Sequence, residues 1–312
     1  MSKKKVLVAG GSGFLGRHLL LNAPEDWRIT AMYNSSRRFP AFVKAHGLAN
    51  VTPAKCDLRK RADVERVAKK HGRTFDLCFF LMGNSDIGLS LREPQTDLAA
   101  NIHTLLNLIE TVKIGKLVFM SSGTVYLGQS GPVGPGTETT PAVPYGITKL
   151  ASELYIRTYA EKTDRIGEYV ILRFFGAYGP MEPERKIYTN LIKSIAIEGA
   201  NKYTLRGDGK NYIDAMYVDD AAEGLIQVAL SDKANVTVDF CRGTPQTINE
   251  LVMDVARILG ADDFTLRHEG GSAEYITFYA SPQKMQRLFG FAPRISLKDG
   301  ILEFKKHLAK GK

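Results

Sequence analysis

Val6-Leu7-Val8-Ala9-Gly10-Gly11-Ser12-Gly13-Phe14-Leu15-Gly16, residues 6–16, is the stretch that decides the fold of this chain. The apolar run at its start predicts a buried strand, and Phe14 to Leu21 predicts a helix directly behind the glycines. In such a strand–loop–helix unit the first glycine permits a tight turn, the second lets the backbone approach a phosphate, and the third lets helix and strand pack closely. The stretch therefore predicts a pyrophosphate-binding turn. The residues of this turn expected to contact a bound dinucleotide are Gly10, Gly13, Phe14, Leu15 and Gly16.

Short apolar strands alternate with helical patterns along the first half of the chain. Further strands are expected at 28–33, 51–54, 75–81, 117–120 and 169–173, and helices at 62–71, 98–112 and 145–160. Such alternation implies right-handed crossovers and an α/β fold with a Rossmann-like, doubly wound parallel sheet. Because ligands bind beyond the carboxyl ends of such strands, the residues that follow each strand are expected to share one edge.

The pattern loosens after about residue 175, where turns become frequent. We expect a dinucleotide-binding domain over 1–175 and mainly a smaller, C-terminal substrate-binding lobe over 176–312, with segments at about 211–242 returning to the sheet. Asp219 is expected to cap a helix. Thr247 and Glu250 predict a capping box for a helix that runs to Leu259, with Gly260 at its end. Two final helices are expected after Ser281 and Ser296.

Composition limits the class of protein. Lys and Arg total 42 against 33 Asp and Glu, a net charge of +9 that suits anionic ligands, although lysine-rich ends supply much of it. The cysteines Cys56, Cys78 and Cys241 have no metal-ligand spacing, so no metal site is predicted and reduced thiols are expected. No stretch approaches the ~20 apolar residues of a membrane helix. A cytoplasmic protein without membrane or nucleic-acid partners is expected.

The end of the second expected strand bears on the choice of dinucleotide. An Asp or Glu about 20 residues past the glycines normally grips the adenosine ribose of NAD. Here that place holds Asn34, followed by Arg37 and Arg38, which would pair with a 2′-phosphate. This favours NADP over NAD, while a hydrogen bond from Asn34 to the ribose of NAD stays open. Asp57, after the third strand, is expected at the adenine amino group or as a helix cap.

Tyr145 and Lys149 are four residues apart, so their side chains lie on one face of the expected helix. A free tyrosine, with a pKa near ~10, is protonated at neutral pH. An ammonium ~4 Å away, at an effective dielectric constant of ~20, supplies the ~4 kcal/mol that lowering this pKa by about three units requires. The pair therefore predicts a proton-transfer group, close to Ser121-Ser122 at the end of another strand.

With these residues assembled, the chain resembles an extended short-chain dehydrogenase/reductase over nearly its whole length. This branch contains nucleotide-sugar epimerases, dehydratases and ketoreductases. Besides the segments above, the resemblance is carried by Asn101, Ser121-Ser122-Gly123-Thr124-Val125-Tyr126, Leu172-Arg173-Phe174-Phe175, Tyr178-Gly179-Pro180, Gly207-Asp208-Gly209 and Tyr217-Val218-Asp219-Asp220. It implies that Ser122, Tyr145 and Lys149 are catalytic, with Lys149 also ordering the nicotinamide ribose.

The resemblance also implies further contacts. Dinucleotide contacts are expected at Leu58, Leu81, Met82, Gly83, Asn101, Lys149 and Phe174, and substrate contacts at Ser85, Thr124, Gly176, Arg185, Lys186, Asn190 and Arg267. Gly123 and Thr124 stand where the family's 4,6-dehydratases carry Asp-Glu, and Thr124 stands where its decarboxylases carry Glu, so neither reaction is expected. Gly176 and Ile213 replace an Asn and a diphosphate-binding Arg of the family.

The sequence favours one function over the others: the NADPH-dependent reduction of a nucleotide-linked keto sugar. A 4-epimerase with tightly bound NAD is the first alternative. A non-catalytic relative that senses dinucleotide or associates with RNA is the second. By analogy with the family, a homodimer is expected to form through the helices at 94–113 and 145–162.

Overall fold

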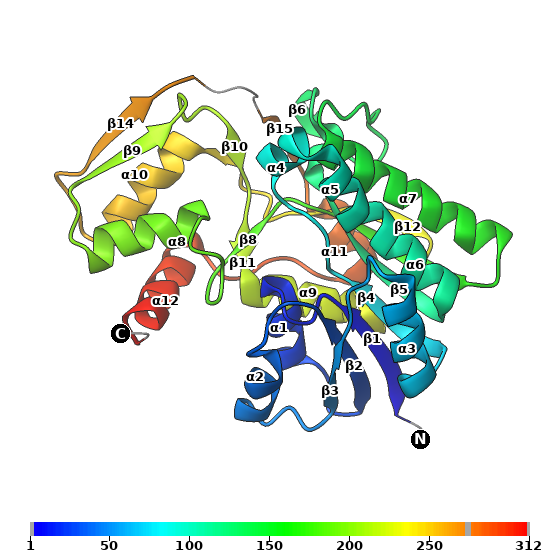
Figure 1. Cartoon of the computed structure of the whole chain (residues 1–312). Coiled ribbons are helices and arrows are strands. Elements are labelled where there is room, and N and C mark those ends of the chain that lie inside the picture. The colour runs from blue at the N-terminus through cyan, green and yellow to red at the C-terminus, as the bar shows by residue number, and fades with distance from the viewer. Residues whose placement is uncertain (1–2, 272–275, 311–312) are drawn as a thin grey trace.

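A parallel sheet of seven strands, in the order β12-β7-β5-β4-β1-β2-β3, forms the centre of the protein (Figure 1). The computed structural model describes residues 3–271 and 276–310. The strands of this sheet are β1 (Lys4–Ala9), β2 (Trp27–Tyr33), β3 (Val51–Lys55), β4 (Thr74–Phe80), β5 (Lys113–Ser122), β7 (Ile166–Phe174) and β12 (Val236–Phe240). The predicted α/β, Rossmann-like class is confirmed.

The register of the strands brings the chemically interesting segments together. β1 and β4 align Ala9 with Phe80, and β5 and β7 align Ser122 with Phe174. The segments that follow these four strands therefore leave the sheet at a common edge, as the sequence predicted.

Helices cover both faces of the sheet because alternate strand residues point to opposite sides. One layer consists of α1 (Phe14–Asn22), α2 (Phe39–Ala45), α9 (Val218–Leu230) and α11 (Gln283–Phe289). The other layer consists of α3 (Arg61–His71), α6 (Thr104–Thr111) and α7 (Pro144–Lys162). Val6 and Val8 pack toward the first layer, whereas Leu7 and Ala9 pack toward the second.

One long helix was expected at 98–112, and the structure divides it. α5 (Pro94–Leu98) passes into a π-helical turn, Ala99–His103, which continues as α6. Such turns occur frequently at functional sites because they shift the register of one side chain. Here the turn carries Asn101, which is buried. The short helices α4 (Ile87–Arg92) and α2 were not predicted from the sequence.

A smaller lobe lies beyond the carboxyl edge of the sheet, at the upper left of Figure 1. It has its own apolar core, in which Leu191, Val255 and Phe304 are fully or almost fully buried. Its elements, together with the short segments that line the edge, are β6 (Ser130–Val133), β8 (Ala177–Tyr178), α8 (Ile187–Ile192), a π turn (Lys193–Ile197), β9 (Lys202–Arg206), β10 (Tyr212–Ile213), β11 (Met216–Tyr217), β13 (Gln246–Thr247), α10 (Ile248–Ile258), β14 (Thr265–Glu269), β15 (Thr277–Ala280) and α12 (Leu297–Lys310).

Local sequence signals in this part have mixed outcomes. The Thr247–Glu250 capping box is present at the start of α10, and Gly260 follows the helix with a positive φ of 79°. Asp219, in contrast, does not cap α9, whose N-cap is Tyr217. Its carboxylate instead lies 3.0 Å from Nδ1 of His18 on α1.

His18 joins the two parts of the fold. Its Nε2 lies 2.9 Å from the carbonyl oxygen of Pro180, in the loop after β8. The neighbouring Asp220 accepts backbone hydrogen bonds from Arg294 and Ile295. The two carboxylates of Tyr217-Val218-Asp219-Asp220 thus fasten α9 to different segments. No helix in the described part of the chain has the length and apolar character that a membrane span requires.

Candidate active site

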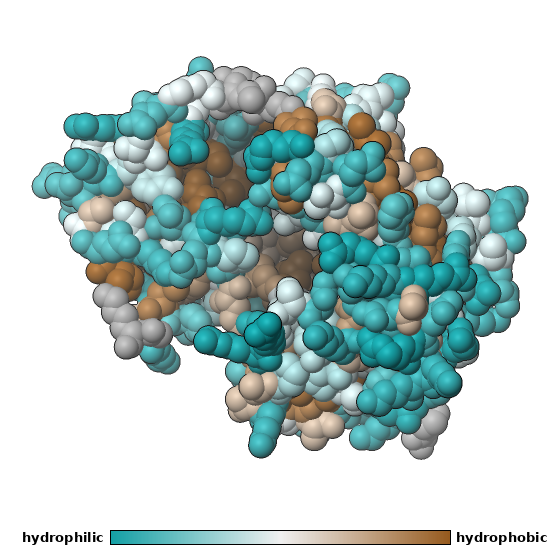
Figure 2. All heavy atoms as spheres, in the orientation of Figure 1, coloured by the Kyte–Doolittle hydropathy of each residue, from teal (hydrophilic) through white to brown (hydrophobic). Residues whose placement is uncertain are grey.

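A cavity of about 630 Å³ lies between the carboxyl edge of the sheet and the smaller lobe. In Figure 2 it appears as a hollow near the centre of the molecule, with apolar side chains on its walls. The glycine loop, the segments after β4, β5 and β7, and the loops around 182–187 and 211–215 line it. Predicted site residues on its wall are Gly13, Phe14, Leu15, Gly16, Leu81, Met82, Gly83, Ser85, Ser122, Thr124, Tyr145, Lys149, Phe174, Gly176, Arg185 and Lys186.

The glycine loop fits a dinucleotide pyrophosphate. A Cβ on Gly16 would lie 2.3 Å from the carbonyl oxygen of Gly10, so only glycine allows helix and loop to approach this closely. α1 begins at Phe14 with no side-chain cap and no acidic residue in its first turn. Its first backbone N–H groups therefore remain available to an anion, and the helix dipole favours negative charge there.

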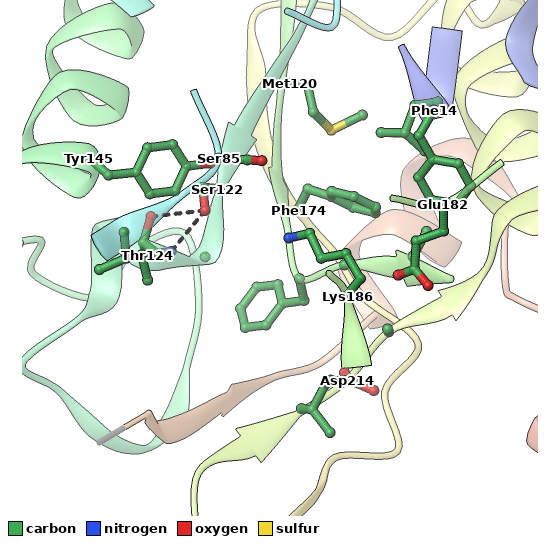
Figure 3. A pocket seen from close by; sticks show the side chains of 18 of the residues that line it. Phe14, Ser85, Met120, Ser122, Thr124, Tyr145, Phe174, Glu182, Lys186 and Asp214 are labelled. Atoms are coloured by element: carbon green, nitrogen blue, oxygen red, sulfur yellow. Dashed lines mark hydrogen bonds between the residues drawn. The ribbon is translucent and has the colours of Figure 1, made fainter. Parts of the chain in front are cut away.

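Ser122 lies at the last position of β5, opposite Tyr145 (Figure 3). Its Oγ accepts hydrogen bonds from Thr124, from the backbone N–H at 3.2 Å and from Oγ1 at 2.9 Å. Tyr145 is the second residue of α7, is buried, and hydrogen-bonds with Ser122. A carbonyl or hydroxyl oxygen in the cavity can thus meet a phenol and a hydroxyl together.

Lys149 is held one turn further along α7. Its ammonium donates a hydrogen bond of 3.0 Å to the carbonyl oxygen of Met120 and lies 6.0 Å from the centre of the Tyr145 ring. Burial lowers the pKa of Lys149 to about 8, with Asp97 and Glu153 opposing the shift.

The expected lowering of the Tyr145 pKa is wrong for the protein without ligands. Burial raises the pKa of Tyr145 to about 12, partly offset by the hydrogen bond with Ser122, and Lys149 does not contribute to the shift. The physical reason is that burial removes water from the phenol and so penalises its charged form, and the negative charge of Asp97 acts in the same direction. Tyr145 therefore holds its proton until further positive charge is placed beside it.

A buried polar cluster supports the cavity floor behind Lys149. Asp97 accepts hydrogen bonds from Nδ2 of Asn84 at 2.7 Å, Nδ2 of Asn101 at 3.0 Å and Oγ1 of Thr148 at 2.7 Å. Asn101 Oδ1 is buried without a partner in the described structure. A Cβ on Gly83 would lie 2.3 Å from this oxygen and 3.2 Å from Nζ of Lys149, so glycine is needed between them.

A second cluster lies beneath Ser122. Oγ of Ser121 donates to Glu153 at 2.6 Å, and Arg173 binds both oxygens of Glu153, at 3.0 and 2.8 Å. Arg173 also donates to Tyr126, whose hydroxyl donates to Asp239 at 2.8 Å. Since all of these groups are buried and paired, they fix the end of β5 against α7. Glu153 was not predicted from the sequence, although it follows Lys149 by one helical turn.

The side of the cavity facing Tyr145 carries charged groups. Glu182 accepts two hydrogen bonds from Thr189, and burial raises its pKa to about 7. Burial also raises the pKa of Asp214, which accepts hydrogen bonds from the backbone of Gly243 and Thr244. Neither carboxylate was predicted, since nothing in the local sequence marks them as cavity residues.

Two predicted substrate residues lie elsewhere. Asn190 is exposed on α8 and accepts a hydrogen bond from Tyr203, and Arg267 is exposed on β14, at the outer side of the lobe. Neither residue lines the cavity, because the packing of the lobe leaves both side chains exposed. Of the predicted dinucleotide residues, these do not line the cavity: Gly10, Asn34, Arg37, Arg38, Asp57, Leu58 and Asn101.

Four of these residues lie in the loops that follow β2 and β3. Asn34, Arg37 and Arg38 are exposed just after β2. Asp57 makes a bidentate ion pair with Arg59. Arg17, which was not predicted, donates to Ser36 in the same loop at 3.2 Å. Its buried Nε has no partner, and no carboxylate pairs with it in the described structure.

The family is shown by comparison with known proteins. The family model "NAD dependent epimerase/dehydratase family" matches residues 6–239. The uncharacterized UDP-glucose epimerase YtcB of Bacillus subtilis is 27% identical over 95% of both chains, and a putative UDP-glucose 4-epimerase of Methanocaldococcus jannaschii is 28% identical over 95% of both. The solved UDP-N-acetylglucosamine 4-epimerase from Methanobrevibacter ruminantium M1, in complex with UDP-N-acetylmuramic acid, is 26% identical, with a TM-score of 0.86 over 100% of both chains.

These relatives confirm the resemblance drawn from the motifs, and the residues of the cavity fit an NAD(P) dinucleotide. The chain belongs to the NAD dependent epimerase/dehydratase family, the extended branch of the short-chain dehydrogenases/reductases, and is an enzyme of that family.

Proposed function

We propose that this protein is a nucleotide-sugar 4-epimerase that retains its dinucleotide through the reaction. The observation that carries the proposal is that Ser122, Tyr145 and Lys149 share one cavity with the glycine loop. The named 4-epimerases among its relatives support this reaction over the keto-sugar reduction that the sequence favoured. A role without catalysis would not require this set of residues.

A bound NAD(P) would supply a hydride acceptor and donor for the sugar carbon, and its oxidised ring would add positive charge to the site. The phenolate of Tyr145 then takes the proton of the C4 hydroxyl, and the same phenol later gives it back to the keto oxygen. Ser122 donates a hydrogen bond to that oxygen and Lys149 stabilises the phenolate. The backbone N–H groups of Phe14 and Leu15 would hold its pyrophosphate.

Removal of water from the sugar is not part of the proposal. Elimination needs an acid and a base beside the reacting oxygen, and the residues after Ser122 are Gly123 and Thr124, which do not titrate in this range. Thr124 instead donates to Ser122, so its hydroxyl positions the catalytic serine.

Epimerisation without added dinucleotide is the expected result of a first assay. The purified protein should convert UDP-glucose or UDP-N-acetylglucosamine into its C4 epimer with no net change in dinucleotide oxidation state, measured by NMR and absorbance. Denatured protein should release a stoichiometric dinucleotide, identified by mass spectrometry. Turnover that consumes one NADPH per product would contradict the epimerase.

An NADPH-dependent keto-sugar reductase is the second candidate. It is favoured by Asn34, which stands after β2 where NAD-binding relatives of the fold carry a carboxylate, and by Arg17, whose guanidinium donates to Ser36 but whose Nε has no partner in the described structure. A 2′-phosphate would satisfy such a group. The dinucleotide released in the assay above distinguishes the two, since NAD supports the epimerase and NADP supports the reductase.

We also propose a homodimer through α5 and α7. Ile147, Leu154 and Tyr155 on α7 are 53%, 54% and 40% exposed, and Leu91 and Leu98 on α4 and α5 are also exposed. An apolar set of this kind on adjacent helices suits a second copy of the same face. Leu154→Glu is therefore expected to give a monomer by light scattering. Leu230→Glu, equally exposed on α9, serves as control and should leave the mass unchanged; a Leu154→Glu protein of wild-type mass would overturn the proposal.

A further inference from the structure

Three cationic side chains line the described cavity, and only one lacks a partner. Lys149 donates to Met120, and Arg185 is exposed and pairs with Asp86 at 3.7 Å. Lys186, the residue before α8, is half-buried, and its ammonium makes no hydrogen bond or ion pair with any described residue. A cation withdrawn from water without a partner is unfavourable, so this position is suited to receive an anion.

The carboxylates on the wall do not serve as that anion. Glu182 receives two hydrogen bonds from Thr189 on Oε2, and its pKa of about 7 leaves it partly protonated at neutral pH. Its charge opposes the lowering of the Lys186 pKa by burial but forms no ion pair with Lys186. Asp214 is held by two backbone N–H groups. Neither lies within ion-pair distance of Lys186.

The side chain of Lys186 extends toward Ser122, so its charge lies in the part of the cavity where the proposed reaction takes place. Figure 3 shows Lys186 extending from the side of Glu182 and Asp214, past Phe174, toward Ser122. Ile213, Ile248, Ile276 and Phe278 also line the cavity and are apolar, and the described lining holds no cation besides the three named above. An anionic group of a ligand therefore has Lys186 as its nearest unpaired charge.

We propose that Lys186 binds an anionic oxygen group of the substrate inside this cavity. This rests on the proposed function, which supplies the sugar nucleotide. Two parts of such a substrate have the required chemistry: the diphosphate, and the carboxylate of a uronic acid. Lys186 would thus take the place of the diphosphate-binding arginine whose expected position holds Ile213.

The test measures binding rather than turnover. Lys186→Met is made in a Tyr145→Phe parent, and the affinities for UDP-glucose and UDP-glucuronate are measured by calorimetry. Losing one partner of a desolvated charge pair is expected to weaken binding by ~30-fold or more. Equal losses for both ligands identify the diphosphate as the partner, and a loss confined to UDP-glucuronate identifies the sugar carboxylate. Lys186→Arg should retain most of the affinity because it keeps the charge.

Lys193→Met is the matched control, since Lys193 follows α8 and pairs with Glu184 outside the cavity. It should not change either affinity. The Tm of Lys186→Met should not fall, because a half-buried charge without an ion-pair partner is removed. The proposal is overturned if the parent binds neither ligand, or if Lys186→Met changes both affinities less than about twofold. Lys186-dependent binding together with a wild-type protein that lacks turnover contradicts the proposed reaction alone.

Discussion

Tyr145→Phe is expected to lower kcat by ~10²–10⁴-fold while leaving dinucleotide retention nearly unchanged. The substitution removes only the hydroxyl that exchanges a proton with the substrate oxygen. The ring remains against the same buried surroundings, so the cavity keeps its shape. The measurement compares epimer formation by NMR with the dinucleotide released on denaturation.

Tyr159→Phe is the control for this change, because Tyr159 lies on the same helix but does not line the cavity. Its activity should match the wild type. A Tyr145→Phe protein that retains full turnover would mean that another group moves the proton. Lys149 would be the first to examine, given that burial lowers its pKa to about 8.

Gly16→Ala is expected to have the second large effect, on binding and folding. The new Cβ would lie 2.3 Å from the carbonyl oxygen of Gly10 and 2.9 Å from Cα of Gly11, and both are backbone atoms that cannot move alone. Overpacking of this kind costs ~1–3 kcal/mol of stability. Shifting the loop should also remove at least one hydrogen bond to the pyrophosphate, which weakens dinucleotide binding by ~10-fold or more.

Gly134→Ala provides the comparison, since no heavy atom lies within 4 Å of the place its new methyl group would take and its φ is not in the left-handed region. Thermal unfolding and dinucleotide titration of the two variants measure the effect. If Gly16→Ala binds and unfolds like Gly134→Ala, the glycine loop is not the pyrophosphate site.

The fold, and the meeting of Ser122, Tyr145 and Lys149 in one cavity, were predictable from the sequence because both depend on local patterns. The strand-helix alternation determines a parallel sheet, and the sheet then brings residues after β1, β5 and β7 to one edge. Tyr145 and Lys149 share a helix, so their relation needs no knowledge of the tertiary structure.

The structure differs from the sequence-based expectations where packing between segments far apart in the sequence determines the local geometry. The π turn at Asn101 forms in a segment whose apolar spacing suits an ordinary helix. Arg267 looked like a substrate cation, but its strand pairs with β9 on the outer side of the lobe. The predicted pKa of Tyr145 was wrong because the attraction of the ammonium was considered without the dehydration that complete burial imposes. Glu182 and Arg17 acquire their roles only from neighbours far away in sequence.

The central claim is that a hydride leaves the sugar carbon, is held by the dinucleotide and returns, while Tyr145 moves the proton. UDP-glucose carrying deuterium at C4 tests it most directly when incubated with the purified protein and no added dinucleotide. The account predicts an epimer that retains its deuterium at C4, because a hydride held by the dinucleotide does not exchange with water. An epimer that has lost this deuterium to water would contradict it.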